Sequence, residues 1–486
     1  MSQAENNEVT KEQKTPLPDA PARKPILVAP AVLFPFVIIT TLFAWWGLAN
    51  NMTDTLLPAF KRIMSFDDGT TAWIQVVCYA LGYGCFAIPG AMFMKRFTYK
   101  SGVLLGLGMF VTGTVLFFPA MFTSNSPRLC YFVYLGSILI TFAGLSVLET
   151  ACNPFICAMG SPETATRRLN LAQSFNPLGS IGGVVISQIF ILSHLKSFSA
   201  AERAAMPVDQ LAAVQREELS AISITYASIG LILFVTWLVI LFTKMPTLRE
   251  EDKSVDFVGT WRRLFKNRNY VWGVVAQFFY VGSQIACWSF TVRYCMVALH
   301  LDEVVKESPA LLRTVEPVSA CFYNFCDMVH LDMLIPRTSE QAAATYYIFS
   351  LILFVAARFV CTLAMKFIRP STLLTLLAMT AFGCCVVVTS MLNQWGVYAL
   401  IGVSWCMSLM FPTIFSLGTT GLGDDTKMGG AGMVMAICGA ALLTQIQGYV
   451  SDSFSSIAFA YWIPAVAFLV IAWYAVVVCR KYETAF

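Results

Sequence analysis

Apolar residues along this 486-residue chain gather in long stretches of helical length rather than in the short alternating pattern of β-strands. A helix needs roughly 20 such residues to cross a lipid bilayer. We place twelve such stretches near residues 30–58, 70–94, 100–122, 129–159, 167–193, 220–243, 270–298, 344–367, 372–392, 395–419, 428–450 and 457–479. The pattern predicts an all-α membrane protein with twelve transmembrane helices.

The longest charged interruption, Lys244 to Arg268, falls at the midpoint of the chain, with six predicted spans on each side. The run Pro154–Gly160 in the fourth span also parallels Pro412–Gly418 in the tenth. Equal placement of such a run is typical of transporters with parallel repeats. We expect two pseudo-symmetric six-helix halves and a cytoplasmic linker, at residues 27–243, 269–480 and 244–268.

Composition supports a membrane class and excludes others. Only 12% of the residues are charged, against 57% hydrophobic, whereas soluble chains carry roughly 25% charged residues. The net charge of +4 is spread over short loops. Since no basic patch forms, we expect no nucleic-acid partner. We expect the chain to work as a monomer in the lipid bilayer.

The basic residues indicate the orientation. Lys95, Arg96, Arg262 and Arg369 all fall in segments on the same side as the N-terminus, and such residues concentrate on the cytoplasmic side. Residues 1–26 are polar and contain no apolar core of a signal peptide. We therefore expect both termini to be cytoplasmic, with disordered tails at 1–26 and 481–486.

The fifteen cysteines and three histidines do not form a metal motif: no CxxC occurs, the cysteines lie mostly in apolar stretches, and the histidines lie in predicted loops. Cys321 and Cys326 share the long predicted outer loop, about 299–342. An extracytoplasmic compartment permits a disulfide there. Whether the two are bonded, and what the loop does, stays open.

Two carboxylates lie within apolar stretches, where an ionisable group costs about 3 kcal/mol. Asp54 follows Asn50 and Asn51 by four and three residues, and Glu149 precedes Asn153 by four, so each acid shares a helical face with amides. One interpretation is a protonated acid that joins helices. We favour two acids facing a water-filled cavity, one titrating and the other binding a hydroxylated ligand, because burial brings a carboxyl pKa nearer neutrality.

Further polar side chains recur at helical spacing in the fifth and seventh spans. They are Asn170, Gln173 and Asn176, then Gln277, Tyr280, Gln284 and Trp288. Amides both donate and accept hydrogen bonds, which suits sugar hydroxyls, and an aromatic face suits the apolar side of a pyranose. Helix-to-helix hydrogen bonding is the alternative. Their convergence favours a binding site near the midplane.

Two arginines are also embedded. Arg293 lies near the predicted outer end of the seventh span, where a long side chain can reach the interface. Arg358 lies in the middle of the eighth span, and we expect it to be a structural partner or a cytoplasmic gate rather than a ligand contact.

Several long motifs resemble the bacterial L-fucose–proton symporters, a sugar-transporting branch of the major facilitator superfamily. The resemblance runs from about residue 30 to 475 and is carried by Ala49–Pro58, Leu148–Phe155, Arg168–Asn176, Ala276–Gln277, Ala286–Ser289, Pro412–Gly418 and Asp425–Lys427. It implies a multi-pass protein of the bacterial cytoplasmic membrane that imports a monosaccharide, most simply L-fucose, by alternating access. The coupling ion would be the proton, with no other cofactor.

The resemblance also implies residue roles. Asp54 matches the acid tied to proton coupling, and Glu149 matches the acid tied to sugar recognition. Asn51, Gln173 and Asn176 match polar cavity residues.

Three departures from the family pattern stand out. Phe411 replaces a tyrosine and so removes a hydroxyl from the expected cavity wall, the loop at 299–342 is longer, and the cytoplasmic signature at Gly90–Arg96 is degraded. The change at Phe411 leaves open whether the sugar is L-fucose, glucose, galactose, mannose or N-acetylglucosamine. Uncoupled uniport is the alternative to proton symport. An enzyme is not expected, since no nucleophile, base or metal cluster appears, and no channel filter motif is present.

Overall fold

The computed structural model describes residues 26–64, 74, 76–120, 122, 126–191, 200–246, 256–307, 317–329 and 339–482. Within these residues the chain forms helices and turns and no β-strand. Of the predicted tails, residues 1–25 and 483–486 lie outside the described residues, while Lys481 belongs to a short 3-10 helix, Cys479–Lys481. Residues 247–255 of the linker also lie outside the described residues.

The described helices form twelve membrane-crossing segments, some made of one helix and some of two consecutive helices. In order these are α1 (Leu33–Met64, after the 3-10 turn Pro30–Val32), the π-helical η2 with α3 (Val76–Tyr83 and Gly84–Arg96), α4 (Tyr99–Ala120), α5 (Pro127–Cys157), α6 with α7 (Ala165–Gln173 and Phe175–Phe190), α9 (Val208–Phe242), α11 (Arg268–Ala298), α14 (Ser339–Ala364), α15 (Pro370–Ser390), α16 with α17 (Gln394–Met407 and Met410–Gly418), α18 with α19 (Thr426–Met435 and Gly439–Ser453), and α20 with its continuation (Trp462–Trp473, on to Lys481). Four shorter helices join them: α8 (Ala200–Ala205), α10 (Phe257–Lys266), α12 (Leu301–Glu307) and α13 (Pro317–Met328).

Ten of the segments are long and apolar enough to span a membrane by length and composition alone. The other two are α6–α7, which is interrupted at Ser174, and α11. The first carries the recurrent amides noted in the sequence and the second carries the amides with Tyr280 and Trp288, and these polar groups lower the mean hydropathy of both segments. The prediction of an all-α protein with twelve transmembrane helices is confirmed.

One boundary differs clearly from the prediction, because α9 begins at Val208 rather than near residue 220. The added turns are polar, and their Glu218 accepts two hydrogen bonds from Arg203 of α8, at 2.9 and 2.6 Å. Both side chains are fully buried. An ion pair with two hydrogen bonds can hold the start of a helix in place even where the residues are polar. A prediction from hydropathy alone therefore misses this extension.

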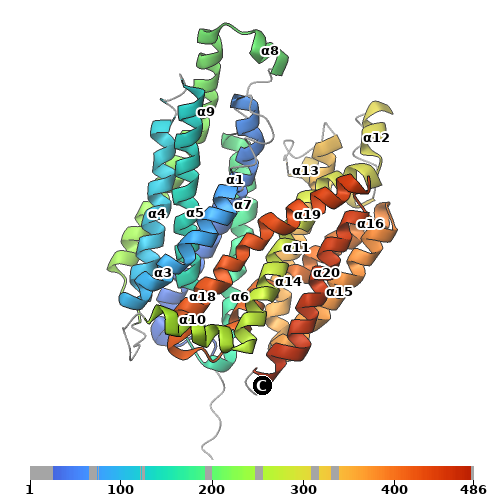
Figure 1. Cartoon of the computed structure of the whole chain (residues 1–486). Coiled ribbons are helices and arrows are strands. Elements are labelled where there is room, and N and C mark those ends of the chain that lie inside the picture. Colours follow the sequence, from blue (N-terminus) through green and yellow to red (C-terminus); the bar gives the residue numbers. More distant parts are fainter. Residues whose placement is uncertain are drawn as a thin grey trace, which may run out of the picture.

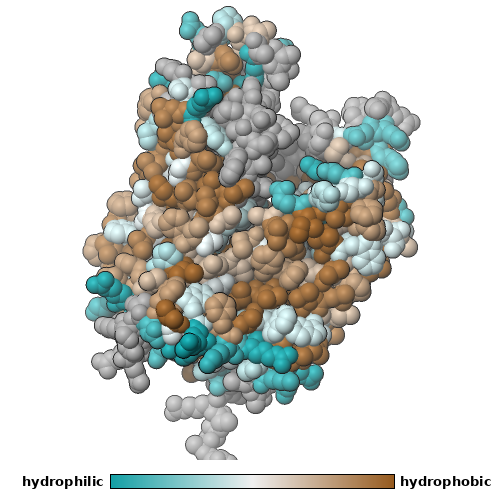
Figure 2. All heavy atoms as spheres, in the orientation of Figure 1, coloured by the Kyte–Doolittle hydropathy of each residue, from teal (hydrophilic) through white to brown (hydrophobic). Residues whose placement is uncertain are grey.

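The helices form two bundles, shown side by side in Figure 1. The N-terminal bundle runs from α1 to α9 and the C-terminal bundle from α11 to α20. We call the end that carries α10 the linker end, and the end that carries α8, α12 and α13 the loop end. Apolar side chains cover the middle of the face shown in Figure 2, and polar ones gather toward both ends, as expected for a bilayer-spanning protein.

The two bundles are joined by hydrogen bonds near the linker end. Asn170 Nδ2 of α6 donates to Thr413 Oγ1 of α17 at 3.1 Å. The Thr166 and Ser416 hydroxyls, on the same two helices, are bonded at 2.9 Å. Lys427 Nζ of α18 donates to the carbonyl of Met94, in the last turn of α3, at 2.9 Å. These contacts close the space between the bundles at the linker end.

Close packing of α1 against α7 positions one wall of that space. A Cβ atom added to Gly179 would lie 1.8 Å from the carbonyl oxygen of Ala44, and one added to Gly47 would lie 2.0 Å from that of Asn176. Both distances are far below van der Waals contact, so only glycine lets these backbones approach. Small residues at helix interfaces serve this purpose in membranes.

Gly179→Ala is therefore expected to destabilise the protein by about 1–3 kcal/mol, the usual cost of overpacking. Thermal melting in detergent measures the effect. Gly182→Ala is the matched control on the same helix, because a Cβ there meets no atom within 4 Å. Equal melting temperatures for the two variants would contradict this account of the α1–α7 contact.

Candidate functional site

A cavity of about 550 Å³ lies between the bundles, within the roughly 300–1,000 Å³ typical of small-molecule sites. Its walls come from α1, η2 and α6–α7 on one side and from α11, α14, α17 and η9 (Ala436–Cys438) on the other. The interbundle hydrogen bonds close it toward the linker end.

The wall from the N-terminal bundle is polar. It presents amide, hydroxyl and phenol groups together with the Trp46 indole: Asn50, Asn51, Gln173, Asn176, Ser180, Tyr79 and Tyr83. The amides are held by neighbouring groups: Asn51 Nδ2 donates to the Gly47 carbonyl at 3.2 Å, and Asn176 Nδ2 to that of Phe43 at 3.3 Å. Asn51, Gln173 and Asn176, which the sequence singled out, therefore share this wall.

The wall from the C-terminal bundle is mainly aromatic and apolar. It includes Gln284 and Trp288 on α11 together with Tyr280, Val281, Ile285, Tyr347, Leu351, Phe354, Phe411 and Ile437. Trp288 is fixed by a hydrogen bond from Nε1 to Ser404 Oγ at 3.1 Å and by an edge contact with Phe354, ring centres 5.2 Å apart. A rigid indole of this kind offers a flat face to an apolar surface of a ligand.

Phe411 lies at this wall edge-on to Tyr280, with ring centres 6.3 Å apart. The Tyr280 hydroxyl is directed elsewhere, to the Met407 carbonyl at 3.0 Å. Phe411 itself brings no hydroxyl to this wall, and the hydroxyl of Tyr280 is engaged by the Met407 carbonyl.

Arg358 lines the cavity at its closed end. Its guanidinium donates across the bundle boundary to the Gln173 carbonyl at 2.9 Å and also to the Ser408 carbonyl. Its charge lies 4.7 Å from the centre of the Phe354 ring. Arg358 thus joins the two bundles, and it also lines the cavity, where we had not expected it to meet a ligand. Arg293 lies at the other end, exposed over the Phe290 ring at 5.5 Å.

Glu149 does not face the cavity, contrary to our expectation. The side chain is 4% exposed and lines a separate hollow of about 10 Å³ with Leu42, Phe43, Leu148 and Cys152. Trp46 lines both spaces and donates from Nε1 to the Tyr83 hydroxyl. Within the described chain, Glu149 Oε2 has no hydrogen-bond partner. The indole therefore stands between an unpaired acceptor and the cavity, which hydropathy and spacing could not reveal.

Two other expected cavity residues lie behind the walls. Asn153 is fully buried and accepts a hydrogen bond from Gln173 Nε2 at 2.8 Å, so it orients a lining residue without lining the cavity itself. Gln277 is also fully buried, and both polar atoms of its amide lack partners in the part of the chain described. Helical spacing put both on a polar face but could not fix how deep each lies.

Asp54 lies on α1, and its side chain lies outside what the structure describes. Its expected place near the cavity stays a prediction. Cys321 and Cys326 both lie on α13 and are free thiols. This helix packs on α14, where the Tyr323 and Thr345 hydroxyls are bonded at 2.9 Å.

Chemically, the cavity offers hydrogen-bond donors and acceptors on one side and aromatic faces on the other. A compact polyol with one apolar face matches both walls. Sequence spacing gave the amides, but it missed Trp46, Tyr79, Tyr83 and Phe354 as lining residues. Aromatic residues are common in every span, so no pattern separates those that line a cavity from those that pack against neighbours.

Residues 36–425 match the Major Facilitator Superfamily. The chain is 34% identical over 453 residues to the L-fucose-proton symporter of Haemophilus influenzae, covering 91% of this chain and 96% of that protein. It is 34% identical over 443 residues to the L-fucose-proton symporter of Escherichia coli, covering 90% and 92%. A glucose/galactose transporter of Brucella abortus is 26% identical, with 91% and 94% covered.

Solved structures give the same picture. The Escherichia coli fucose:proton symporter matches with a TM-score of 0.77 and 32% identity, covering 93% of this chain and 99% of that one. A structure of the same transporter described as outward in conformation matches with a TM-score of 0.78 and 32% identity, covering 94% and 100%. A proton:xylose symporter, at 12% identity over 92% and 96% and a TM-score of 0.53, shares the fold alone.

Proposed function

This chain belongs to the Major Facilitator Superfamily, and from that premise we propose that it imports L-fucose together with protons across a bacterial cytoplasmic membrane. The L-fucose-proton symporters of Haemophilus influenzae and Escherichia coli, matched over nearly their whole length, support both the sugar and the coupling ion. The protein is a multi-pass membrane transporter rather than an enzyme. The two halves are assigned to residues 27–243 and 269–480.

The observation that carries the proposal is the two-sided cavity. Hydroxyls of a pyranose meet Asn51, Gln173 and Asn176 on the polar wall, and its apolar side lies on Trp288 of the opposite wall. Gln284 supplies a further amide there. L-fucose carries a methyl group in place of a hydroxymethyl group, and the apolar ring of Phe411 is suited to contact that methyl group.

Roles for the buried groups follow from their place behind the walls. Asn153 holds the Gln173 amide in orientation through its 2.8 Å hydrogen bond. Glu149 accepts from the sugar once the Trp46 indole moves aside, since the indole alone lines both spaces among the described residues. Gln277 supports the packing of α11. Asp54 carries the coupled proton.

Alternating access then requires the linker end to open. We assign that end to the cytoplasm, from the concentration of basic residues there, and so place both termini in the cytoplasm and describe the cavity as facing outward. Opening inward breaks the hydrogen bonds of Arg358 to Gln173 and of Lys427 to Met94. Arg358 therefore acts as a gate that binds both bundles in the outward state. The chain performs this cycle as a monomer.

A second candidate is another hexose. The glucose/galactose transporter of Brucella abortus supports it, at lower identity. The distinction rests on whether the sugar bears a polar group where Phe411 lies.

Competition for uptake into proteoliposomes tests the sugar. We expect unlabelled L-fucose to displace radiolabelled L-fucose at lower concentration than glucose, galactose, mannose or N-acetylglucosamine do. The reason is that a hydroxymethyl group must leave water to reach an apolar wall, which costs free energy when no partner is present. Stronger competition by one of the other hexoses would replace L-fucose with that sugar.

A further inference from the structure

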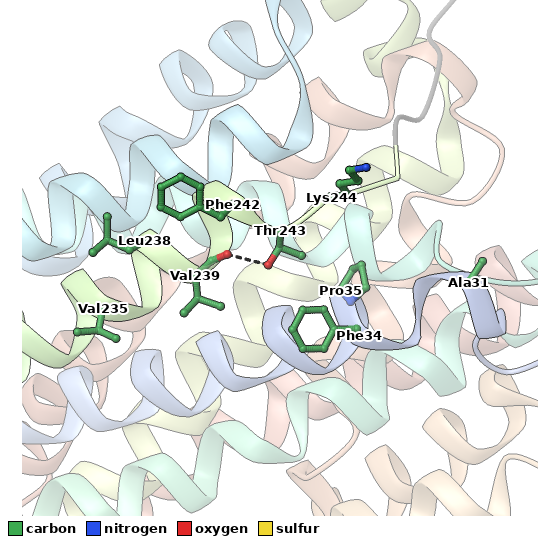
Figure 3. Close-up of a pocket in the computed structure, with 9 residues that line it drawn as sticks. All are labelled: Ala31, Phe34, Pro35, Val235, Leu238, Val239, Phe242, Thr243 and Lys244. Atoms are coloured by element: carbon green, nitrogen blue, oxygen red, sulfur yellow. Dashed lines mark hydrogen bonds between the residues drawn. The ribbon is translucent and has the colours of Figure 1, made fainter.

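A second hollow, open to the surroundings, lies on the outer surface of the N-terminal bundle, away from the transport cavity. This groove has a volume of about 690 Å³ and is lined by Ala31, Phe34 and Pro35 of the α1 segment, by Val235, Leu238, Val239 and Phe242 of α9, and by Thr243 and Lys244 just beyond it. Figure 3 shows the α9 residues in a row facing the start of α1, with Lys244 past the end of the row. We call it the α1–α9 groove.

The groove exists because α1 and α9 meet at the loop end and separate toward the linker end. At the loop end Gln215 Nε2 of α9 donates to the Ile63 carbonyl of α1 at 2.8 Å. At the other end Phe34, Val239 and Phe242 remain exposed, Phe242 by 81%. Since both helices span the membrane, these apolar side chains face lipid rather than water.

Its dimensions suit one leaflet of a bilayer. From Val235 to Phe242 the lining follows α9 for roughly 10 Å at 1.5 Å a residue, which fits within the roughly 15 Å depth of one half of the hydrocarbon core. The helix ends at Phe242, and Lys244 follows in an extended segment. The lysine therefore lies at the level where apolar chains give way to headgroups.

Two cations flank that end of the groove. Lys244 is exposed, and Lys100 of α4 donates to the carbonyls of Leu241 and Thr243 at 2.8 and 2.9 Å. An ammonium group has three N–H donors, so Lys100 keeps one for another acceptor. None of the described residues that line the groove is a carboxylate. Its apolar body and cationic end are complementary to an acyl chain and a phosphate.

We propose that the α1–α9 groove is a binding site for an anionic phospholipid of the linker-side leaflet. One acyl chain lies against Phe34, Val239 and Phe242, and the headgroup phosphate accepts hydrogen bonds from Lys244 and Lys100. The lipid fills the space between α1 and the end of α9. Helix α1 carries Asn50 and Asn51 of the transport cavity, and the linker follows α9. This proposal does not depend on which sugar the protein carries, because the described residues that line the α1–α9 groove are all different from those that line the transport cavity.

Native mass spectrometry of the purified full-length protein with added phosphatidylglycerol or phosphatidylcholine, both with the same acyl chains, tests the site. We expect wild type to retain phosphatidylglycerol in preference to phosphatidylcholine. Lys244→Ala should weaken phosphatidylglycerol binding about fivefold, since a lysine near the surface contributes on the order of 1 kcal/mol toward anionic lipid. Val239→Trp, which fills the groove without changing charge, should reduce retention of both lipids.

Lys366→Ala is the matched control, since Lys366 is another exposed lysine at the linker end but lines no part of the groove. It should bind phosphatidylglycerol like wild type. Equal retention of the two lipids by wild type, unchanged binding in Lys244→Ala, or the same loss in Lys366→Ala would overturn the proposal. So would unchanged retention in Val239→Trp, because binding would then need the charge but not the groove.

Discussion

Asp54→Asn is expected to abolish uphill accumulation of sugar while leaving exchange of sugar across the membrane. An asparagine keeps the size and the hydrogen-bonding capacity of the side chain but cannot take up or release a proton. An acid within an apolar span is costly, and Asp54 follows the cavity residue Asn50 by four positions on α1. A proton carried there during the cycle would couple the two gradients.

Two assays on the same proteoliposomes separate coupling from binding. Accumulation driven by an imposed pH gradient should disappear in Asp54→Asn, whereas counterflow of radiolabelled sugar with no gradient should persist. Asp302→Asn on α12 is the control, because this carboxylate is exposed in the loop region. Undiminished accumulation by Asp54→Asn would move the coupling role to another group.

Glu149→Gln is expected to lower sugar affinity by roughly ten- to a hundredfold. The carboxylate oxygen Oε2 is buried with no partner among the described residues, so it can accept from a sugar hydroxyl once the Trp46 indole moves aside. Charge-assisted hydrogen bonds contribute about 1.5–3 kcal/mol, and each 1.4 kcal/mol is tenfold in affinity. Glutamine preserves the size and polarity but removes the charge.

Calorimetric titration across pH distinguishes recognition from a purely structural role. A glutamate side chain titrates and a glutamine side chain does not. Glu149→Gln should therefore bind L-fucose weakly and with little dependence on pH, whereas Asp54→Asn should bind it comparatively strongly. Glu303→Gln, at an exposed position on α12, serves as the control. Wild-type affinity in Glu149→Gln would remove the recognition role and leave a protonated structural acid.

The architecture could be predicted from the sequence because membrane helices are encoded locally. Each apolar stretch predicts one membrane-spanning helix by itself. The two less apolar segments, α6–α7 and α11, can still be recognised because turns bound them. The polar start of α9 could not be predicted, since it depends on the ion pair of Glu218 with Arg203. That contact joins separate helices and leaves no local pattern.

For the candidate site, the sequence could predict which face of a helix each residue lies on, but not how deeply its side chain is buried. Spacing by three placed Gln173 and Asn176 on one helical face, the family resemblance added Asn51, and all three line the cavity. The same rule placed Glu149 there, although Trp46 covers it. A helical pattern gives the direction of a side chain about its own axis, while exposure depends on what the neighbouring helix places in front.

The most direct test of proton-coupled L-fucose import is uptake by proteoliposomes that contain only the purified protein. With an outside pH lower than the inside pH, radiolabelled L-fucose should accumulate above its external concentration, and a protonophore should return it to equilibrium. Added L-fucose should also alkalinise a weakly buffered external medium, because protons enter with the sugar. Equilibration of L-fucose without accumulation, unaffected by the pH gradient, would contradict the account and show an uncoupled uniporter.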